Sequence, residues 1–582
     1  MAGVQVDAPE ARQLRVWSLD RKPLSELSCL PYGVGHAEEG VCLQVQMGPY
    51  RVMLDCGLTS LEALSSATNP LAPVDFVFCT HAHPDHGRSL LQLHQYWPDL
   101  PIYCSEATAE LLPLNWPLEA LPAGADFCQR LPWRQSIELA EGLTVQLWPA
   151  GHLPGAACIL LAYTSPERHY SVFYTGDCFL SNSRLVEGLP LDELRGLKPD
   201  VLIVEGSQGT ARYPHRRQQE NRLADQINQA IATGHNVLLP VPLMGLGQEL
   251  LMLLRSHHHF TGRDLTVWVD AWVAQACDIY LNLLPHLPSN VQNFARHQPL
   301  FWDDRVLPRL QRLPPTLPDD PGHPAILVGY QNANLAELVR WGELPWRIFL
   351  PDDLASSVVN AGLETDSTHP QPTLDWLQDL GPELGQGQAH LDTYLLTTHS
   401  DGAGTTQLIH NLRPHHVVFV HGSPGFLADL ASLEDLQSRY KLHLPSANQV
   451  VELPIGDTFL QPVAPDTLFE GEIAATEAGV TVTLPPEVQE DPRWNRLADT
   501  GVVQIRWQGN DLVIRGLTQQ SLLRQANSPA TLNPSVQSCF NCIHWQQPRC
   551  NNSASSMYGF PVAAEGYCPQ FAARQDTQAN AD

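Results

Sequence analysis

Positive charge is scarce in this chain. Lysine occurs only at Lys22, Lys198 and Lys441, and 34 basic residues stand against 62 acidic ones, which gives a net charge of −28. Proteins bind polynucleotides without sequence preference mainly through lysine and arginine, which displace counterions from the phosphates. The composition therefore argues against a general nucleic-acid-coating protein, and any polynucleotide substrate must be held by local features.

Long apolar runs are missing as well. No stretch approaches the roughly 18 apolar residues of a membrane-spanning helix, and residues 1–21 lack an apolar run of signal-peptide length. No internal repeat of solenoid length occurs either. We therefore expect a soluble, cytoplasmic protein with no membrane partner. The 582 residues, 43% of them hydrophobic, are enough for two or more domains.

What the chain does have is a cluster of imidazoles and a carboxylate in residues 79–87, Cys-Thr-His-Ala-His-Pro-Asp-His-Gly. The apolar stretch before it, ending at Phe78, is typical of a buried strand. Alternate side chains of an extended chain point the same way, so His81 and His83 can converge on one metal. Asp85 and His86 then face a second, and two zinc ions about 3.5–4 Å apart can share one water. The alternative is a histidine-rich surface turn.

Three further segments repeat the pattern of an apolar strand followed by a metal-binding type of side chain. A lone histidine at a strand end is more often capped or solvated, so each match is weak by itself. Because all three follow the histidine-rich motif in this order, together they are strong evidence for further metal ligands. The segments are Val145–Trp148 before His152, Ser171–Tyr174 before Asp177, and Val417–Val420 before His421.

With these motifs the chain resembles the metallo-β-lactamase superfamily. The resemblance implies an α/β fold, an αββα sandwich, with two zinc ions at the catalytic site. Asp55, in the segment Met53–Gly57, fits the early aspartate of the family, which orients a metal ligand. By resemblance, one zinc ion would be held by His81, His83 and His152, the other by Asp85, His86 and His421, with Asp177 between them.

The part of the chain between Asp177 and His421 resembles the β-CASP branch, whose members act mainly on nucleic acids. Glu205 follows an apolar strand and fits the first acidic motif of that branch, and the segments around His399 and His421 match the second and third. The resemblance covers roughly residues 25–460. It implies metal-assisted hydrolysis in which Asp85, Glu205 and His399 are catalytic.

In that mechanism His399 would protonate the leaving oxygen as a general acid. A carboxylate that we assign to Glu205 would orient its imidazole. Asp401 is a weaker candidate for the same task, because its place two residues after His399 also suits shaping the turn.

Two segments depart from the β-CASP pattern. Leu246 stands where the family has an arginine, and Val328–Asn332 replaces a glycine-rich segment. Both elements normally help to hold a phosphate backbone. We expect Arg212, Arg216 and Arg217 to contact phosphate instead, because guanidinium groups suit phosphate. With Arg222 they form the one local concentration of positive charge, and the alternative is an exposed basic turn that enters a helix.

The motifs divide the chain into five parts. A β-CASP α/β domain is inserted into the sandwich, and a Pro-rich loop (Pro314–Pro324) interrupts it. The expected parts are 1–208, the first part of the metallo-β-lactamase domain; 209–392, the insert; 393–461, the return to the first domain; 462–530, a small β-rich appendage; and 531–582, a Cys-containing tail.

The cysteines fall into two groups. Nine of the thirteen lie at or before Cys277, mostly in or beside apolar strand-like runs, so we expect buried, reduced thiols. The other four have the spacing C-x2-C-x7-C-x17-C, which suits one tetrahedral ion: Cys539, Cys542, Cys550 and Cys568. Zinc is the first choice, with an iron–sulfur cluster or free thiols as alternatives.

Three functions follow from these observations. The first is a zinc-dependent ribonuclease or RNA-processing phosphodiesterase of the β-CASP type, with RNA as substrate. The second is a metallohydrolase of a small phosphodiester or thioester, favoured by the acidic composition and the altered phosphate-binding segments. The third is a non-catalytic scaffold in an RNA-processing complex, which the intact ligand set disfavours. A homo-oligomer or an RNA-processing complex stays open as an assembly.

Overall fold

The structure is a computed structural model that divides into two compact units, Met1–Pro462 and Val463–Asp582. Within the described part of the chain, no helix is both long and apolar enough to cross a membrane. The residues that the structure describes are 26–36, 39–64, 72–116, 127–166, 168–319, 321, 324–352, 375–455, 472–476, 479–483, 503–508, 511–516, 542–546, 549–552 and 572.

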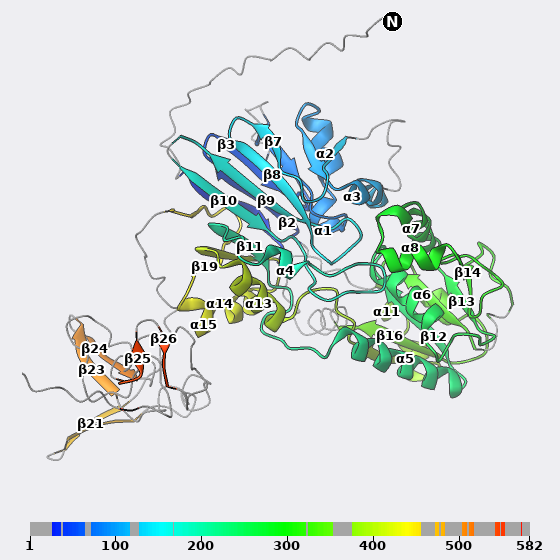
Figure 1. Cartoon of the computed structure of the whole chain (residues 1–582). Coiled ribbons are helices and arrows are strands. Elements are labelled where there is room, and N and C mark those ends of the chain that lie inside the picture. The colour runs from blue at the N-terminus through cyan, green and yellow to red at the C-terminus, as the bar shows by residue number, and fades with distance from the viewer. Residues whose placement is uncertain are drawn as a thin grey trace, which may run out of the picture. The chain divides into compact units, whose positions relative to one another are not determined.

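Two seven-stranded sheets form the centre of the first unit (Figure 1). The first has the order β20-β1-β2-β3-β4-β5-β6, with the bounds β1 Leu27–Val34, β2 Val41–Met47, β3 Tyr50–Leu54, β4 Phe76–Phe78, β5 Ile102–Cys104, β6 Cys128–Arg130 and β20 Val451–Glu452. The second has the order β19-β18-β11-β10-β9-β8-β7, with the bounds β7 Ile137–Ala140, β8 Leu143–Pro149, β9 Ala157–Thr164, β10 His169–Tyr174, β11 Val201–Glu205, β18 His416–Val420 and β19 Lys441–His443.

The alternation of side chains along each strand explains the layers. In β11 all five residues are buried, and Ile203 joins a core between the two sheets while Leu202 joins a core on the helical side. Successive strand residues point to opposite faces, so a strand buried on both faces is apolar throughout. The expected αββα sandwich is confirmed. The covering helices include α1 Pro84–Gly87, α2 Leu90–Tyr96, α3 Glu106–Leu111, α13 Gly402–Leu412 and α14 Pro424–Ala431.

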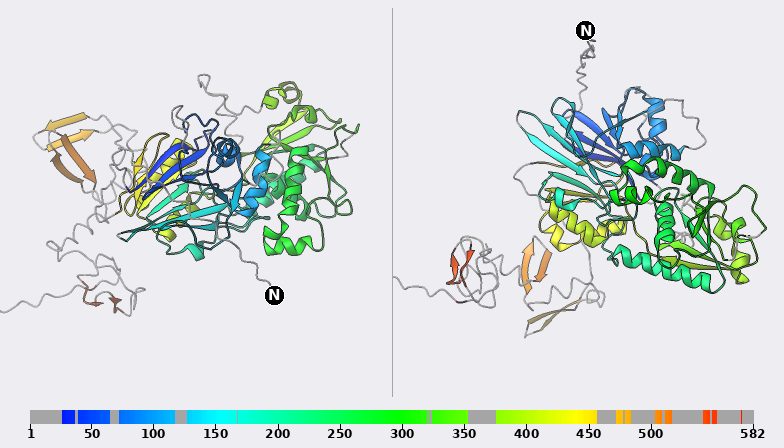
Figure 2. Two further views of the ribbon diagram at one scale, coloured as in Figure 1. Left: turned by 90° about the horizontal axis from the view of Figure 1, so that it is seen from above. Right: turned by 45° about the vertical axis from the view of Figure 1, so that its right-hand side comes forward.

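The insert is an α/β domain whose six-stranded sheet is parallel throughout and lies beside the sandwich in each view (Figures 1 and 2). Its last strand runs to Tyr394, two residues past the expected boundary at 392. The bounds, in sheet order, are β14 Arg309–Arg312, β13 Thr266–Val269, β15 Ile326–Tyr330, β12 Asn236–Val241, β16 Trp346–Pro351 and β17 Ala389–Tyr394; its helices include α5 Arg216–Ala232, α6 Leu246–Ser256, α7 Ala271–Asn282 and α8 Ser289–Ala295.

The second unit contains short antiparallel pairs. The strands expected after residue 462 are present as β22 Gly479–Thr483, β23 Val503–Gln508 and β24 Asp511–Gly516. Of the four tail cysteines, Cys542 is buried, whereas Cys539 and Cys568 lie outside the described residues. The tail metal site therefore stays a prediction. The nine cysteines up to Cys277 are buried and free, as expected.

Candidate metal centre and its neighbourhood

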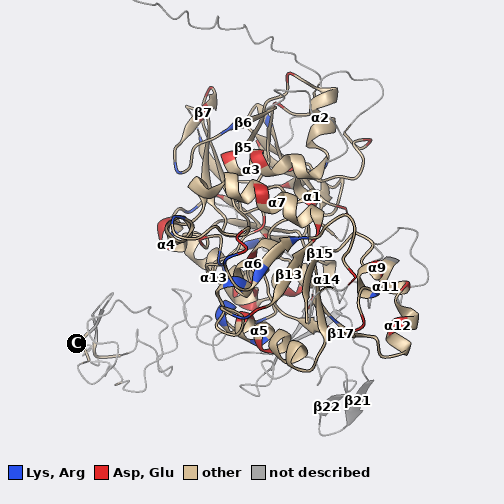
Figure 3. Cartoon of the chain, turned by 90° about the vertical axis from the view of Figure 1, so that its right-hand side faces the viewer, with Lys and Arg blue, Asp and Glu red and all other residues tan. Residues whose placement is uncertain are grey.

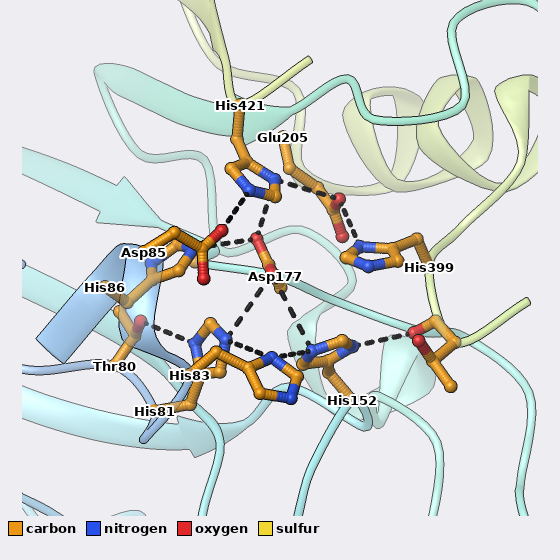
Figure 4. Close-up of polar contacts among 12 residues, drawn as sticks. Thr80, His81, His83, Asp85, His86, His152, Asp177, Glu205, His399 and His421 are labelled. Atoms are coloured by element: carbon orange, nitrogen blue, oxygen red, sulfur yellow. Dashed lines mark hydrogen bonds and ion pairs between the residues drawn. The ribbon is translucent and has the colours of Figure 1, made fainter. Parts of the chain in front are cut away.

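Strand ends bring the candidate site together. Strands β10, β11 and β18 are parallel neighbours, so Asp177, Glu205 and His421 lie at one edge of the second sheet (Figure 4). The histidine-rich loop comes to the same place from the end of β4 in the first sheet. His421 has a φ of 51° and Asp55 a φ of 60°, a left-handed backbone that is uncommon for non-glycine residues and that Asp and His adopt more readily than most.

A close approach of two backbone segments fixes the histidine-rich loop. A Cβ added to Gly57 would lie 1.7 Å from the carbonyl oxygen of Asp85 and 2.7 Å from the amide nitrogen of His86. Only glycine fits this contact, because any side chain would displace the loop that carries both residues.

Three imidazoles form the first group of the site. The Nδ1 atom of His83 lies 3.1 Å from Nε2 of His81 and 3.0 Å from Nε2 of His152. All three rings are buried to a large degree, and burial, then the neighbouring imidazoles, lowers the pKa of His83 to about 3. Three ring nitrogens thus converge while the rings are neutral.

The outer nitrogens of these rings show which inner nitrogens carry lone pairs. His152 Nδ1 lies 2.9 Å from the carbonyl oxygen of Thr398, which can only accept, so Nδ1 carries the proton. The Thr80 hydroxyl donates to Asp55 and therefore accepts from Nδ1 of His81 at 3.0 Å. His83 turns its Nε2 toward the carbonyl oxygen of Met244 at 3.4 Å.

Three lone pairs therefore face one another within about 3 Å, an arrangement that repels itself unless a cation stands among them. Imidazole nitrogens are ligands that zinc accepts. The chemistry of this donor set fits a zinc ion held by His81, His83 and His152.

A second group lies beside the first. His421 Nε2 lies 3.0 Å from an oxygen of Asp85, and His421 Nδ1 lies 3.0 Å from Oδ1 of Asp177. His86 Nε2 lies 3.3 Å from the same Asp177 oxygen. Both His86 Nε2 and Asp177 Oδ1 are buried, and within the described part of the chain neither atom makes a hydrogen bond. Asp177 Oδ2 lies 3.4 Å from His81 Nε2, so one carboxylate faces both groups.

Asp55 lies behind this second group, fully buried. Its carboxylate accepts from His86 Nδ1 at 2.8 Å, from the Tyr174 hydroxyl at 2.7 Å and from the Thr80 amide at 2.7 Å. These contacts hold the His86 ring with its Nε2 directed at Asp177. A second cation between these atoms would give both of them a partner, and this placement suits the orienting role expected of Asp55.

His399 and Glu205 form a hydrogen-bonded pair next to the two groups of candidate metal ligands. His399 Nδ1 donates to Oε2 of Glu205 at 2.8 Å, and the Glu205 carboxylate also accepts from the Ser207 hydroxyl and the Cys178 amide. Burial opposes protonation of His399, but the Glu205 carboxylate outweighs it and raises the His399 pKa to about 9. The imidazole is therefore protonated at neutral pH, as a general acid must be before it acts.

The loop that carries His399 is held by the insert. The backbone N–H of Thr397 donates to Oε1 of Gln219 at 3.1 Å, and Arg216 donates to the Thr397 carbonyl oxygen at 2.5 Å. The Thr397 hydroxyl bonds the His399 backbone on both sides, accepting from its N–H and donating to its carbonyl at 3.1 Å each. Two side chains at the start of α5 thus fix the residues that lead to His399.

This placement corrects the expectation that Arg216 contacts phosphate. Its side chain is 6% exposed, and its guanidinium lies 3.5 Å from the carboxylates of both Glu220 and Glu249. Arg212 and Arg217 are exposed, as the basic-patch hypothesis requires, and Figure 3 colours several Lys and Arg positions of the ribbon blue in the region of α5. Their phosphate contacts stay a prediction.

The contacts of Asp401 agree with the alternative considered for it, shaping the turn after His399, whereas the His399 ring is held by Glu205. Its carboxylate accepts from the Gly404 amide at 2.8 Å and the Tyr213 amide at 3.1 Å, so it caps the start of α13 and ties the loop after Glu205 to it. Leu246, at the position of the family's arginine, is buried at the start of α6.

Several contacts of the site could not be expected from the sequence. The carbonyl groups of Met244 and Thr398 belong to backbone, which leaves no signature in side-chain patterns. Ser207 and Gln219 resemble many polar residues at helix starts and turns. Thr80 alone had a signal, since it directly precedes the histidine-rich motif.

Comparisons with known proteins agree with this geometry. The family described as "Beta-lactamase superfamily domain" matches residues 50–233, and the family described as "Zn-dependent metallo-hydrolase RNA specificity domain" matches residues 388–443. The uncharacterized protein sll0514 of Synechocystis sp. (strain PCC 6803) is 47% identical over 566 residues, 94% of this chain and 97% of that protein. The chain belongs to the metallo-β-lactamase superfamily, in its β-CASP branch.

Two further relatives are more distant. "Probable RNase MJ4" of Methanocaldococcus jannaschii is 26% identical over 259 residues, which cover 41% of this chain and 58% of that protein. "Endoribonuclease YSH1" of Mycosarcoma maydis is 24% identical over 393 residues, which cover 62% of this chain and 42% of that protein. The chain therefore spans about half the length of these two relatives.

Proposed function

We propose that this hydrolase-family chain is a zinc-dependent phosphodiesterase that cleaves RNA, with two zinc ions at the catalytic site. One observation carries the proposal: the unprotonated ring nitrogens of three histidines converge, and a second group of metal-binding side chains lies beside them. Asp177 faces both groups. The family description that names RNA specificity, matched by residues 388–443, supports RNA as the substrate.

In this proposal each donor has a role. Zinc, when bound, would lower the pKa of the attacking water and stabilise the charge that builds on the phosphoryl oxygens. Asp85 and Asp177 supply negative charge that favours cation binding, and Asp55 keeps the His86 ring oriented. The residues that would hold the two ions are His81, His83 and His152 for one, Asp85, His86 and His421 for the other, and Asp177 for both.

The leaving oxygen needs a proton, and His399 is placed to provide it. Glu205 holds the His399 ring through Nδ1 and stabilises its cationic form, which leaves the Nε2–H free to donate to substrate. After the transfer the neutral ring keeps its bond to Glu205. Glu205 thus positions the His399 ring and favours its return to the protonated form.

The decisive experiment incubates the zinc-loaded protein with end-labelled RNA, DNA of the same sequence, and a small phosphodiester. RNA cleavage that disappears in His83→Ala, together with a loss of bound zinc in that variant, is the expected result. Cleavage of RNA that persists in His83→Ala would exclude this site. An expected cytoplasmic location and any RNA-processing partner stay predictions.

A small phosphodiester or thioester is the second candidate substrate. Arg216 is buried rather than exposed, and Leu246 replaces an arginine, so few cations remain to hold a polynucleotide backbone. The same experiment separates the two, because a small-substrate enzyme would hydrolyse the small ester and leave RNA intact. The scaffold alternative predicts no hydrolysis of any of the three substrates.

A further inference from the structure

Three consecutive histidines form a second cluster of ligand-type side chains, at the other end of α6 from the candidate metal centre. Each of His257, His258 and His259 offers a ring nitrogen, and these three atoms lie within 4.8 Å of one another. The ring centroids are 4.3 Å, 4.2 Å and 4.9 Å apart for the three pairs. Although His258 is exposed, its ring lies against both neighbours.

Helix α5 orients two of these rings through their outer nitrogens. His259 Nε2 donates to Oδ1 of Asp225 at 2.7 Å, and His257 Nε2 donates to Oδ1 of Asn221 at 3.3 Å. Asn221 and Asp225 are four residues apart and therefore lie on one face of α5. An imidazole whose outer N–H is held by a carboxylate or amide oxygen presents a lone pair at its other nitrogen, as metal-binding histidines do.

Local electrostatics favour a cation at this place. The three histidines follow directly after the last residue of α6, where the aligned peptide dipoles leave partial negative charge. The Nδ1 atom of His257 accepts only a long contact of 3.3 Å from the His259 amide.

We propose that His257, His258 and His259 bind one divalent transition-metal ion, separate from the candidate catalytic centre. Imidazole donors suit zinc, copper and nickel, and Asp225 orients the His259 ring and adds negative charge. The ion would tie α5 to the end of α6. Helix α5 carries Arg216 and Gln219, which hold the His399 loop. Helix α6 begins two residues after Met244, whose carbonyl faces His83.

The test measures zinc bound per full-length chain after equilibrium dialysis against buffered zinc. We compare the wild type with the double variant His258→Ala/His259→Ala, and with a control double variant at two exposed histidines elsewhere, His169→Ala/His297→Ala. The wild type and the control should bind one zinc ion more per chain than the His258→Ala/His259→Ala variant. Equal zinc in all three proteins would overturn the proposal.

A milder variant keeps the inference testable if the double variant folds poorly. Asp225→Asn leaves a hydrogen-bond acceptor for His259 but removes the charge, so the affinity for this extra ion should fall about 10- to 100-fold. An unchanged affinity would contradict the assigned role of Asp225. The difference in bound zinc between the variants is measured without any hydrolysis assay. The proposed function can therefore be excluded while this second site is confirmed, and this site can be excluded while the proposed function is confirmed.

Discussion

Arg216 donates a hydrogen bond to the carbonyl oxygen of Thr397, two residues before His399, and thereby links the insert to the candidate general acid. The next carbonyl along, that of Thr398, accepts from His152 at 2.9 Å. One short segment thus connects α5 to a candidate zinc ligand and to the candidate acid. The insert therefore helps to position residues of the candidate site.

Replacing Arg216 should therefore lower turnover without weakening the binding of oligonucleotides. We expect Arg216→Ala to lower kcat about 10- to 100-fold, the usual effect of removing a residue that orients a catalytic or metal-binding group. Glu220 and Glu249 would lose a buried partner but keep their other hydrogen-bond donors, so stability should also fall, by about 1–3 kcal/mol. Steady-state kinetics and thermal unfolding measure the two effects.

Two further variants separate positioning from phosphate contact. Gln219→Ala removes the acceptor of the Thr397 N–H together with the bond from Gln219 Nε2 to the Pro214 carbonyl oxygen. It removes no buried charge, so it should reduce kcat in the same direction with a smaller loss of stability. Arg217→Ala, exposed at the next position of α5, should leave kcat on a dinucleotide unchanged. A rise in KM without a change in kcat for Arg216→Ala would show that Arg216 binds substrate after all.

The sequence predicted the positions of the candidate zinc ligands but not that of Arg216. Strand ends with a histidine or an acidic residue predicted the positions of Asp177, Glu205 and His421, because apolar strands with polar ends have a strong pattern. Arg216 has no such pattern, since its partners are a carbonyl group and Glu249, which lies 33 residues away. The i, i+4 spacing of Arg216 and Glu220 was the one local sign of pairing.

The His399–Glu205 pair gives a prediction that separates proton donation from zinc binding. His399→Ala should keep its zinc but lose about 10²- to 10⁴-fold in turnover on RNA, the usual contribution of a general acid. A substrate with a nitrophenolate leaving group needs no proton and should lose much less. Glu205→Gln is the matched variant for His399→Ala, because it keeps the shape of the Glu205 side chain but removes the negative charge that raises the pKa of His399. Equal losses on both substrates would exclude His399 as the acid.

A histidine pair away from the site predicts how stability depends on pH. His443 donates through Nε2 to Nδ1 of His416 at 2.9 Å, and His416 donates through its own Nε2 to the Pro454 carbonyl at 3.0 Å. Burial, then His416 and Lys441, lowers the pKa of His443 to about 4. Below the ordinary histidine pKa of about 6.5, the unfolded chain binds a proton that the folded chain does not.

Stability should therefore fall as the pH drops from about 6.5 to about 4, and this effect should be absent above that range. Chemical unfolding across this pH range measures it. His443→Leu should flatten the acid side of the profile relative to wild type, while His415→Ala, whose side chain is 73% exposed, should not. Identical pH profiles for wild type and His443→Leu would show that the pair does not contribute.

The exposed arginines decide between a polynucleotide and a small substrate. If RNA is the substrate, Arg212 and Arg217 extend the attraction beyond the metal centre, so Arg212→Ala/Arg217→Ala should lower kcat/KM on long oligonucleotides far more than on dinucleotides. Few phosphates are neutralised, and each contributes a salt slope of only about 0.7 for single strands, so affinity should fall gently with salt. Arg195→Ala, at an arginine that is 64% exposed elsewhere on the surface, is the control. The small-substrate hypothesis predicts instead that kcat/KM is independent of chain length in the wild type and in the double variant, and that result would exclude RNA as the substrate.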